Sequence, residues 1–371
     1  MNTASGVPYL DLAEAAAADE PDLSFAVLAA VRRGRYVLGG EVAAFEAEWA
    51  SCCGAARAVG VANGTDAITL ALRALGNGPG DEVLTVSMTC APTATGILRA
   101  GATPVFVDVE EDRLTMDAAR LAGAVTPRTK AILPVHLYGR VAEVDAIGAF
   151  ARERGLVVVE DCAQAHGAAW NGRPVGTFGR TAAWSFYPTK NLGALGDAGA
   201  VTVAGAADAD VADRVARLRS YGYATRNDAG ERGFNSRLDE IQAAALRVRL
   251  RKLAAGNRRR AEIAARYDAA LAGAVRVPPP ARSGEAPAHH LYVVRVPDRE
   301  AFRARLSEKG VGTDVHYPRA VHEQPAFARL PRGPLPATER AMCEVVSLPL
   351  HPLLTDSEAD RVIAAVLASA R

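Results

Sequence analysis

The 371-residue sequence predicts an α/β protein in which helices cover both faces of a mostly parallel sheet. Three observations favour this class. Short apolar runs alternate with segments of helical periodicity between residues 57 and 203. Polar side chains follow the ends of these runs, where ligands bind in such sheets. After about Glu240 the pattern changes, which indicates a second, smaller unit.

Composition excludes several classes of partner. A hydrophobic content of 49% with 23% charged residues is typical of a globular protein, and a net charge of +1 gives no electrostatic reason to expect nucleic acid or a membrane. No apolar run has transmembrane length, and the first twenty residues lack the basic start and apolar core of a signal peptide. The spacing of the five cysteines fits neither a disulfide framework nor a zinc site, so we expect a reducing cytoplasm and no metal.

The elements follow in order along the chain. Residues 24–50 look helical, with a break near Arg33–Gly40. Helical periodicity recurs over Ala67–Leu75, Thr93–Ala100 and Val144–Arg154. Seven strands are expected, near Arg57–Val61, Val83–Ser87, Pro104–Asp108, Ala131–Val135, Leu156–Glu160, Ala182–Phe186 and Ala200–Val203.

The C-terminal part reads as a smaller α+β unit. One long helix is expected over Ile241–Ala269. A strand (Leu291–Val296), a helix (Arg299–Lys309), a short strand leading into His316 and a final helix from Asp356 follow. We therefore predict a large domain with an N-terminal helical arm over residues 1–240. The connecting helix and the small domain then occupy residues 241–371.

A single lysine lies in a glycine-rich loop between the last two predicted strands. Lys190 is the only lysine between residues 131 and 251. The loop glycines would let the backbone take positive φ and approach a ligand; they are at positions 193, 196 and 199. A lone lysine is most often a solvated surface charge. Here an acid and an anion-binding turn precede it in the order that a Schiff-base site for pyridoxal phosphate would need.

Two upstream motifs supply that turn and that acid. Gly64, Thr65 and Asp66 lie where the first core strand meets a helix, so free N–H groups could bind an anion, or the side chains could simply cap the helix. Asp161 ends a buried strand, where a carboxylate is costly unless paired. Its partner could be a protonated pyridine nitrogen or a structural cation. Gln164 could point to the same ligand from the next turn.

Other candidates carry weaker signals. Ser185, just before the lysine loop, could close the anion site, and His166 is more often a packed histidine than a catalyst. Asn235 is placed immediately before a helix, where asparagine is a common cap. The proline-interrupted segment HYPRAVHEQP is either a surface loop or a substrate contact; its candidates are His316, Tyr317 and His322.

Six motifs taken together resemble one family. VANGTDAI, PVHLYG, EDCAQAHGA, SFYPTKNLGALGDAGA, GFNSRLDEIQAA and VHYPRAVHEQP, in this order, resemble the DegT/StrS family of sugar aminotransferases. The resemblance covers about Val61 to the end of the chain. It implies a fold-type-I enzyme dependent on pyridoxal phosphate, with a seven-stranded sheet. It also implies a homodimer whose cofactor sites lie near the subunit interface.

The resemblance assigns roles residue by residue. Lys190 matches the Schiff-base lysine and proton shuttle, and Asp161 matches the partner of the pyridine nitrogen. Gln164 matches the residue near the ring's 3-hydroxyl. Asn235 matches the residue that reaches the phosphate from the neighbouring subunit. The phosphate cradle corresponds to Gly64, Thr65, Asp66 and Ser185, and the substrate contacts to Tyr187, His316 and Tyr317.

One position departs from many relatives. Where they stack an aromatic residue or a histidine on the cofactor ring, this sequence has Cys90 in SMTCAPTAT. A thiol offers less contact area and no π face. Cys90 is therefore a candidate cofactor contact, or a small buried hydrophobe.

The function implied by the resemblance is transfer of an amino group from L-glutamate to a keto-sugar. The short motif GFNSRLDE resembles the branch that acts on dTDP-linked 3-keto-6-deoxysugars in antibiotic or glycan biosynthesis. A free keto-cyclitol is the alternative substrate. Two further alternatives are a dehydratase and a non-catalytic regulator that only binds the cofactor. The family's dehydratases have another residue in place of the lysine, so Lys190 argues against the first. The intact set of cofactor-binding residues argues against the second.

Overall fold

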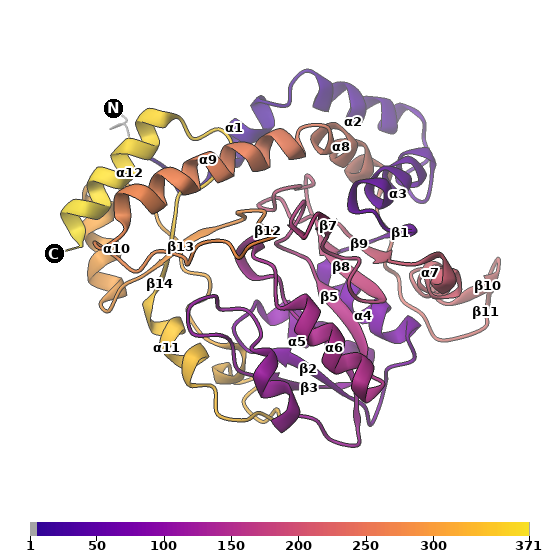
Figure 1. The fold of residues 1–371 in the computed structure, drawn as a ribbon. Coiled ribbons are helices and arrows are strands. Elements are labelled where there is room, and N and C mark those ends of the chain that lie inside the picture. The colour runs from indigo at the N-terminus through magenta and orange to yellow at the C-terminus, as the bar shows by residue number, and fades with distance from the viewer. Residues whose placement is uncertain (1–5, 371) are drawn as a thin grey trace.

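The computed structural model describes residues 6–370 (Figure 1). Residues 1–5 and 371 lie outside the described range. The structure therefore does not describe the first residues of the larger predicted domain or the last residue of the smaller one. It also does not describe the first five of the twenty residues considered as a signal peptide. Within the described range, no helix is both long enough and apolar enough to cross a bilayer. The cytoplasmic location stays a prediction.

A seven-stranded sheet forms the centre of the larger part of the molecule. Its order is β1-β9-β8-β5-β4-β2-β3, and only β9 runs antiparallel to its neighbours. This confirms the predicted seven-stranded, mostly parallel sheet. The strands are β1 (Arg57–Val61), β2 (Glu82–Val86), β3 (Thr103–Val107), β4 (Thr129–Ile132), β5 (Val157–Asp161), β8 (Thr181–Ser185) and β9 (Gly199–Val203).

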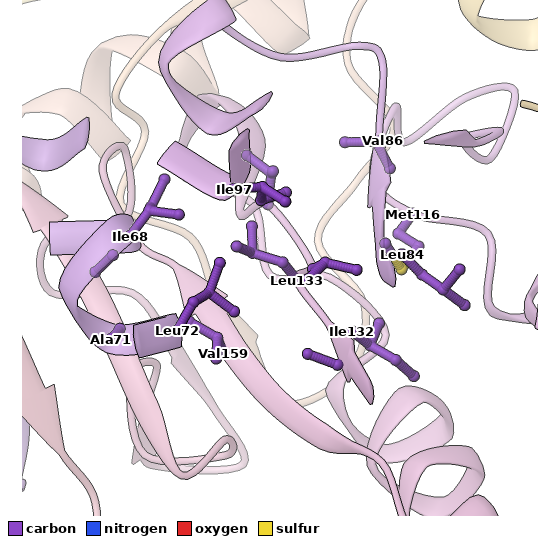
Figure 2. Packing of buried hydrophobic residues seen from close by; sticks show 14 of the residues in the cluster. Ile68, Ala71, Leu72, Leu84, Val86, Ile97, Met116, Ile132, Leu133 and Val159 are labelled. Carbon is purple, nitrogen blue, oxygen red and sulfur yellow. The ribbon is translucent and has the colours of Figure 1, made fainter. Parts of the chain in front are cut away.

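Helices cover both faces of this sheet because the strands are apolar on both sides. Along β8, Ala183 belongs to one buried cluster, whereas Ala182 and Trp184 belong to the other. Figure 2 shows the first cluster, in which Ile68 and Ile97 from two helices pack towards strand residues. The helices of this part are α4 (Gly64–Ala74), α5 (Ala91–Ala100), α6 (Val144–Arg154) and α7 (Ala209–Leu218).

The opposite face is covered by helices from distant parts of the sequence. α3 (Gly40–Cys53) contributes Phe45 and Trp49, and α8 (Glu240–Leu250) contributes Leu246, to the cluster that contains Trp184. The rings of Trp49 and Trp184 meet edge to face, with centroids 4.9 Å apart. α1 (Leu12–Ala17) and α2 (Asp22–Arg32) precede them, and α2 ends where the sequence predicted a break.

Glu240 joins α8 to the beginning of α3. Its buried carboxylate accepts hydrogen bonds from the amides of Gly39 (2.8 Å), Glu41 (3.0 Å) and Val42 (2.9 Å). These amides lie in the first turn of α3, which has no cap from its own side chains. A glutamate 200 residues away therefore supplies the cap.

We expect Glu240→Ala to lower the free energy of unfolding by about 3 kcal/mol, because it leaves three amide donors without acceptors. Urea denaturation of the variant would measure this. Glu308→Ala, an exposed glutamate on another helix, is the matched control. A change for Glu240→Ala no larger than that of the control would contradict the capping role.

The predicted single helix over Ile241–Ala269 is wrong. The structure has two helices, α8 and α9 (Leu253–Leu271), separated at Arg251–Lys252. α8 packs on α2 and α3, whereas α9 packs on α12 (Asp356–Ser369). Each helix is thus held by a different part of the protein. The division of the chain at residue 240 stays a prediction.

The C-terminal part contains a two-stranded antiparallel sheet. β13 (Tyr292–Arg295) was predicted, but its partner β14 (Val345–Leu348) was not. The predicted short strand before His316 is wrong, since only two isolated bridges form in this described segment, Val7 with Val311 and Asp314 with Ser347. The remaining elements are α10 (Arg299–Glu308), α11 (Pro336–Glu344), β6 (Ala169–Trp170), β7 (Arg173–Pro174), β10 (Tyr223–Thr225), β11 (Asp228–Ala229), β12 (Glu285–Ala286) and four short 3₁₀ helices, η1 (Ala118–Gly123), η2 (Leu137–Gly139), η3 (Ala206–Asp208) and η4 (Val321–Glu323).

The N-terminal segment completes this C-terminal part. Val7 donates a backbone hydrogen bond to Gly310 (2.7 Å) and accepts one from Gly312 (2.9 Å). Its side chain is buried in a cluster with residues of α9, α10 and α12. The segment then leads through α1 to α2, on the side of the larger part, so the N-terminal arm connects both parts of the molecule.

Candidate active site

One cavity of about 310 Å³ lies at the carboxyl ends of the central strands and at the first turns of α4 and α5. Most of the side chains that the sequence singled out meet here. They are Gly64, Thr65, Cys90, Asp161, Gln164, Ser185, Tyr187, Lys190 and Tyr317. The position agrees with the general rule that open α/β sheets bind ligands at the carboxyl ends of their strands.

Asp161 is the last residue of β5 and is buried. Its Oδ2 accepts a hydrogen bond from the Thr93 hydroxyl (2.9 Å), and its Oδ1 accepts one from the amide of Ala163 (3.1 Å). Burial raises the pKa of this carboxyl group, while these two bonds and the nearby Lys190 oppose the rise. Both hydrogen-bond donors are neutral, so a cationic partner inside the cavity would stabilise the ionised carboxylate further.

Lys190 enters the same cavity from the loop between β8 and β9. Its amide donates a hydrogen bond to the carbonyl of Tyr187 (2.8 Å), which fixes the tight turn before it. Burial lowers the pKa of the ammonium group, while Cys90 and Asp161 act in the opposite direction. Compared with a lysine in water, the surroundings therefore shift the equilibrium towards the neutral amine, which is the nucleophilic form of lysine.

The glycines of this loop serve a different purpose from the one predicted. The expected positive φ values are wrong, because none of the three glycines adopts one. A Cβ atom on Gly193 would lie 2.4 Å from the carbonyl oxygen of Pro188, and one on Gly199 would lie 2.5 Å from the backbone of Asn63. The glycines let the loop pack closely against the protein itself, which holds Lys190 in place.

The first turn of α4 forms an anion site. The Asn63 side chain caps the helix by accepting a hydrogen bond from the amide of Asp66 (2.8 Å). Within the described chain, the amides of Gly64 and Thr65 remain without an acceptor and lie at the cavity. A Cβ atom on Gly64 would lie 2.6 Å from Cβ of Ser185, so the serine hydroxyl is brought against this turn. Two free amides at the positive end of a helix suit a phosphate group.

Asp66 does not take part in this cavity through its side chain. Its carboxylate forms an ion pair with Arg99 and does not line the cavity. The capping role of Asn63 was not predicted, although asparagine directly before a helix is a strong signal for a cap.

A hydrogen-bonded chain forms one wall of the cavity. The Gln164 side chain accepts from the amide of Tyr138 (2.6 Å) and donates to the hydroxyl of Tyr317 (2.8 Å). The Tyr138 hydroxyl in turn donates to the carbonyl of His316. These bonds fix both Gln164 and Tyr317 in orientation. His316 itself lies outside the cavity lining, with Nδ1 2.8 Å from the Ser347 hydroxyl.

Cys90 occupies the position just before α5 and lines the cavity. It is exposed, and its surroundings raise the pKa of the thiol, mainly through desolvation, while Lys190 and Tyr317 oppose the rise. Cys90 thus lines the same cavity as Lys190 and Asp161 and offers it a polarisable thiol group.

Three predicted candidates lie elsewhere. Asn235 is exposed, and its predicted place immediately before a helix is wrong, since α8 begins at Glu240 after its cap residue. His166 packs among aromatic rings, and burial lowers its pKa to about 3, so it is neutral at physiological pH. His322 is buried 2.7 Å from the Ser87 hydroxyl.

A buried trio behind the site could be mistaken for a metal centre. A ring nitrogen of His136, a carboxylate oxygen of Glu160 and the sulfur of Cys162 all lie within 4.8 Å of one another. The Glu160 carboxylate, however, already accepts bonds from the amides of Gly176 (2.9 Å) and Gly179 (2.7 Å) and contacts His136 Nε2 (3.0 Å). We interpret His136 and Glu160 as a hydrogen-bonded pair in the core. The absence of a metal stays a prediction.

Comparison with known proteins agrees with this geometry. A family model described as the DegT/DnrJ/EryC1/StrS aminotransferase family matches residues 19–367. The chain belongs to this family. A dTDP-3-amino-3,4,6-trideoxy-alpha-D-glucose transaminase of Streptomyces venezuelae is 45% identical over 363 residues, which cover 97% of this chain and 95% of that protein.

Solved structures extend the comparison to the fold. The X-ray structure of S. venezuelae DesV in complex with a ketimine intermediate is 44% identical, covers 99% of both chains and has a TM-score of 0.95. The structure of NtdA from Bacillus subtilis with bound cofactor PMP is 30% identical and has a TM-score of 0.91, covering 100% of this chain and 86% of that one. The predicted fold class, the aminotransferase activity and the pyridoxal-phosphate cofactor are confirmed.

The residues present fit this cofactor. A buried carboxylate with only neutral donors suits a pyridinium nitrogen, and a lysine with a lowered pKa suits its aldehyde. The turn with two free amides suits its phosphate. The assignment of each residue to a part of the cofactor stays a prediction.

Proposed function

We propose that this aminotransferase moves the amino group of L-glutamate to the keto carbon of a nucleotide-linked deoxysugar, specifically a dTDP-linked 3-keto-6-deoxysugar. One observation carries the proposal: Lys190, Asp161 and the first turn of α4 line a single cavity. The similarity to a transaminase named for a dTDP-3-amino sugar supports the substrate class.

Each part of the cavity has a role in this proposal. Bound pyridoxal phosphate supplies an electron sink for the carbon next to the transferred nitrogen. Asp161 keeps the pyridine nitrogen protonated, and the amides of Gly64 and Thr65, with the Ser185 hydroxyl, hold the phosphate. Cys90, which lines the cavity, would contact the ring in place of an aromatic side chain.

Lys190 performs the proton transfers. Its amine would hold the cofactor through the aldehyde group and, when free, would accept and donate the proton that moves during transamination. The lowered pKa of Lys190 matters here, because only the neutral amine accepts a proton. Gln164, held by Tyr138 and Tyr317, would contact the ring's hydroxyl group.

The substrate enters beside two tyrosines. Tyr187 lies at the cavity and is 52% exposed, while Tyr317 is fixed by Gln164. We propose Tyr187 and Tyr317 as direct substrate contacts. His316, the third predicted contact, lies outside the cavity lining, and we propose that it acts through the position of the following tyrosine.

We also propose that the active unit is a homodimer in which Asn235 of one chain reaches the phosphate bound to the other. Asn235 is exposed, as this role requires. The helix α2 presents Phe25, Leu28 and Val31 to solvent, and Phe25 is 68% exposed. A second copy of the chain would cover this apolar face.

Mixing two inactive variants tests this arrangement. Lys190→Ala and Asn235→Glu are each expected to be nearly inactive, the second because its carboxylate repels the phosphate. Refolded together, they should form mixed dimers with one intact site each, and regain about a quarter of the wild-type rate. No recovery in a mixture that forms dimers would contradict the role of Asn235 across subunits.

A substrate comparison tests the reaction itself. We expect L-glutamate to convert the cofactor to its amino form, and the dTDP-linked 3-keto sugar to reverse that change with the highest kcat/KM. A 4-keto sugar nucleotide and a keto-cyclitol serve as competitors in the same assay. Faster amination of the cyclitol would favour the alternative substrate class, and no response to glutamate would favour a binding protein without activity.

A further inference from the structure

Thr93 connects the beginning of α5 to the cofactor-facing carboxylate. It is buried in the first turn of α5, and its hydroxyl oxygen lies 2.9 Å from Oδ2 of Asp161 and 2.8 Å from the hydroxyl oxygen of Thr89. Thr89 is buried as well. Two threonine hydroxyls and one carboxylate therefore form a continuous chain.

The direction of these two hydrogen bonds follows from the single hydroxyl hydrogen that each threonine carries. An ionised carboxylate can only accept, so the single hydroxyl hydrogen of Thr93 points to Asp161. Thr89 must then donate to Thr93. Both hydrogen bonds point towards the negative charge, and each strengthens the other.

We propose that Thr93, supported by Thr89, is a positioning residue that orients Asp161 and keeps it ionised against the cofactor's pyridine nitrogen. This inference rests on the proposed role of Asp161. The Ala163 amide holds Oδ1 and Thr93 holds Oδ2, so the carboxylate plane is fixed from both sides. Each oxygen still has a free lone pair that can accept the pyridinium hydrogen.

The hydroxyl of Thr93 opposes the effect of burial. Burial raises the pKa of the Asp161 carboxyl group, and the Thr93 hydrogen bond acts against the rise. A protonated Asp161 could not keep the ring nitrogen charged, so the electron sink would weaken. The hydroxyl therefore affects the chemistry of the ring without touching the substrate.

The test compares Thr93→Val, which removes the hydroxyl at nearly constant volume, with Thr93→Ser, which keeps it. The apoprotein of each is titrated with pyridoxal phosphate and with the analogue that carries CH in place of the ring nitrogen. We expect Thr93→Val to weaken binding of pyridoxal phosphate about tenfold and to leave binding of the analogue unchanged. Thr93→Ser should bind both within about threefold of wild type.

Turnover gives a second measurement. Thr93→Val should lower kcat about ten- to a hundredfold, and Thr93→Ser should recover most of this loss. Thr89→Val should show a smaller change in the same direction, since it removes only the outer bond. Thermal unfolding would show whether Thr93→Val folds. If it does not, Thr89→Val still tests the chain of hydrogen bonds that ends at Asp161.

Two results would overturn the inference: equal weakening for both cofactors in Thr93→Val, or a serine variant as impaired as the valine variant. Either would show that the methyl packing of Thr93 matters and its hydroxyl does not. Failure of the proposed sugar substrate is a separate result, because the difference between the two cofactors is measured without any substrate.

Discussion

Lys190→Ala is expected to abolish the visible absorbance of the lysine-bound cofactor and to lower transamination about ten-thousandfold. The reason is geometric as well as chemical. The loop that carries Lys190 is packed so tightly that Gly193 has no room for a Cβ atom, and no other lysine of the described residues lines this cavity. Absorption spectra of the purified variant and a glutamate-dependent assay would measure both effects.

The exposed lysine of β4 provides the matched control. Lys130→Ala removes the same side chain far from the cavity lining and should keep the wild-type spectrum and rate. Full turnover together with an unchanged visible band in Lys190→Ala would contradict the assignment of this lysine.

Asp161→Asn is expected to have the second largest effect, a loss of about a thousandfold in kcat. The amide has nearly the same shape but no charge, so it cannot hold the pyridine nitrogen in its protonated form. One of its terminal atoms also becomes a donor, which conflicts with the donors that now face the carboxylate, Thr93 and the Ala163 amide. Steady-state kinetics and cofactor titration would measure the change.

A surface aspartate separates this effect from general loss of charge. Asp210→Asn, in the exposed first turn of α7, should leave kcat and cofactor affinity unchanged. If Asp161→Asn retained more than about a tenth of the wild-type rate, the ring nitrogen would not depend on this carboxylate.

The central sheet and the two main site residues could be predicted because local sequence determines them. Each strand is an apolar run bounded by turn residues. Asp161 directly follows one such run, and Lys190 lies in the loop after another. Their meeting in one cavity follows from the parallel arrangement, in which the carboxyl ends of β5 and β8 lie at the same edge.

Other features depend on contacts that are distant in sequence. Arg251 and Lys252 are good helix formers, so nothing local marks the break between α8 and α9; it arises because the two helices pack on different partners. The first turn of α3 is capped by Glu240, about 200 residues later. A reading of local patterns cannot find such a cap.

The remaining errors concern side chains whose direction the sequence does not give. Asp66 stands in the right turn, but its carboxylate pairs with Arg99 instead of facing the anion site. Nothing in the local sequence distinguishes Thr93 from Thr95 in the same helix, and only the distance to Asp161 reveals its role.

The pairing of Val7 with Gly310 and Gly312 has a consequence for biosynthesis. All seven strands of the central sheet lie between residues 57 and 203, so they are available while the ribosome is still translating the rest. The cluster that buries Val7 includes Val362 and Val366, which are translated long after the central sheet. Val7 must therefore remain without its native contacts, accessible to chaperones and proteases, until these residues of α12 have been translated.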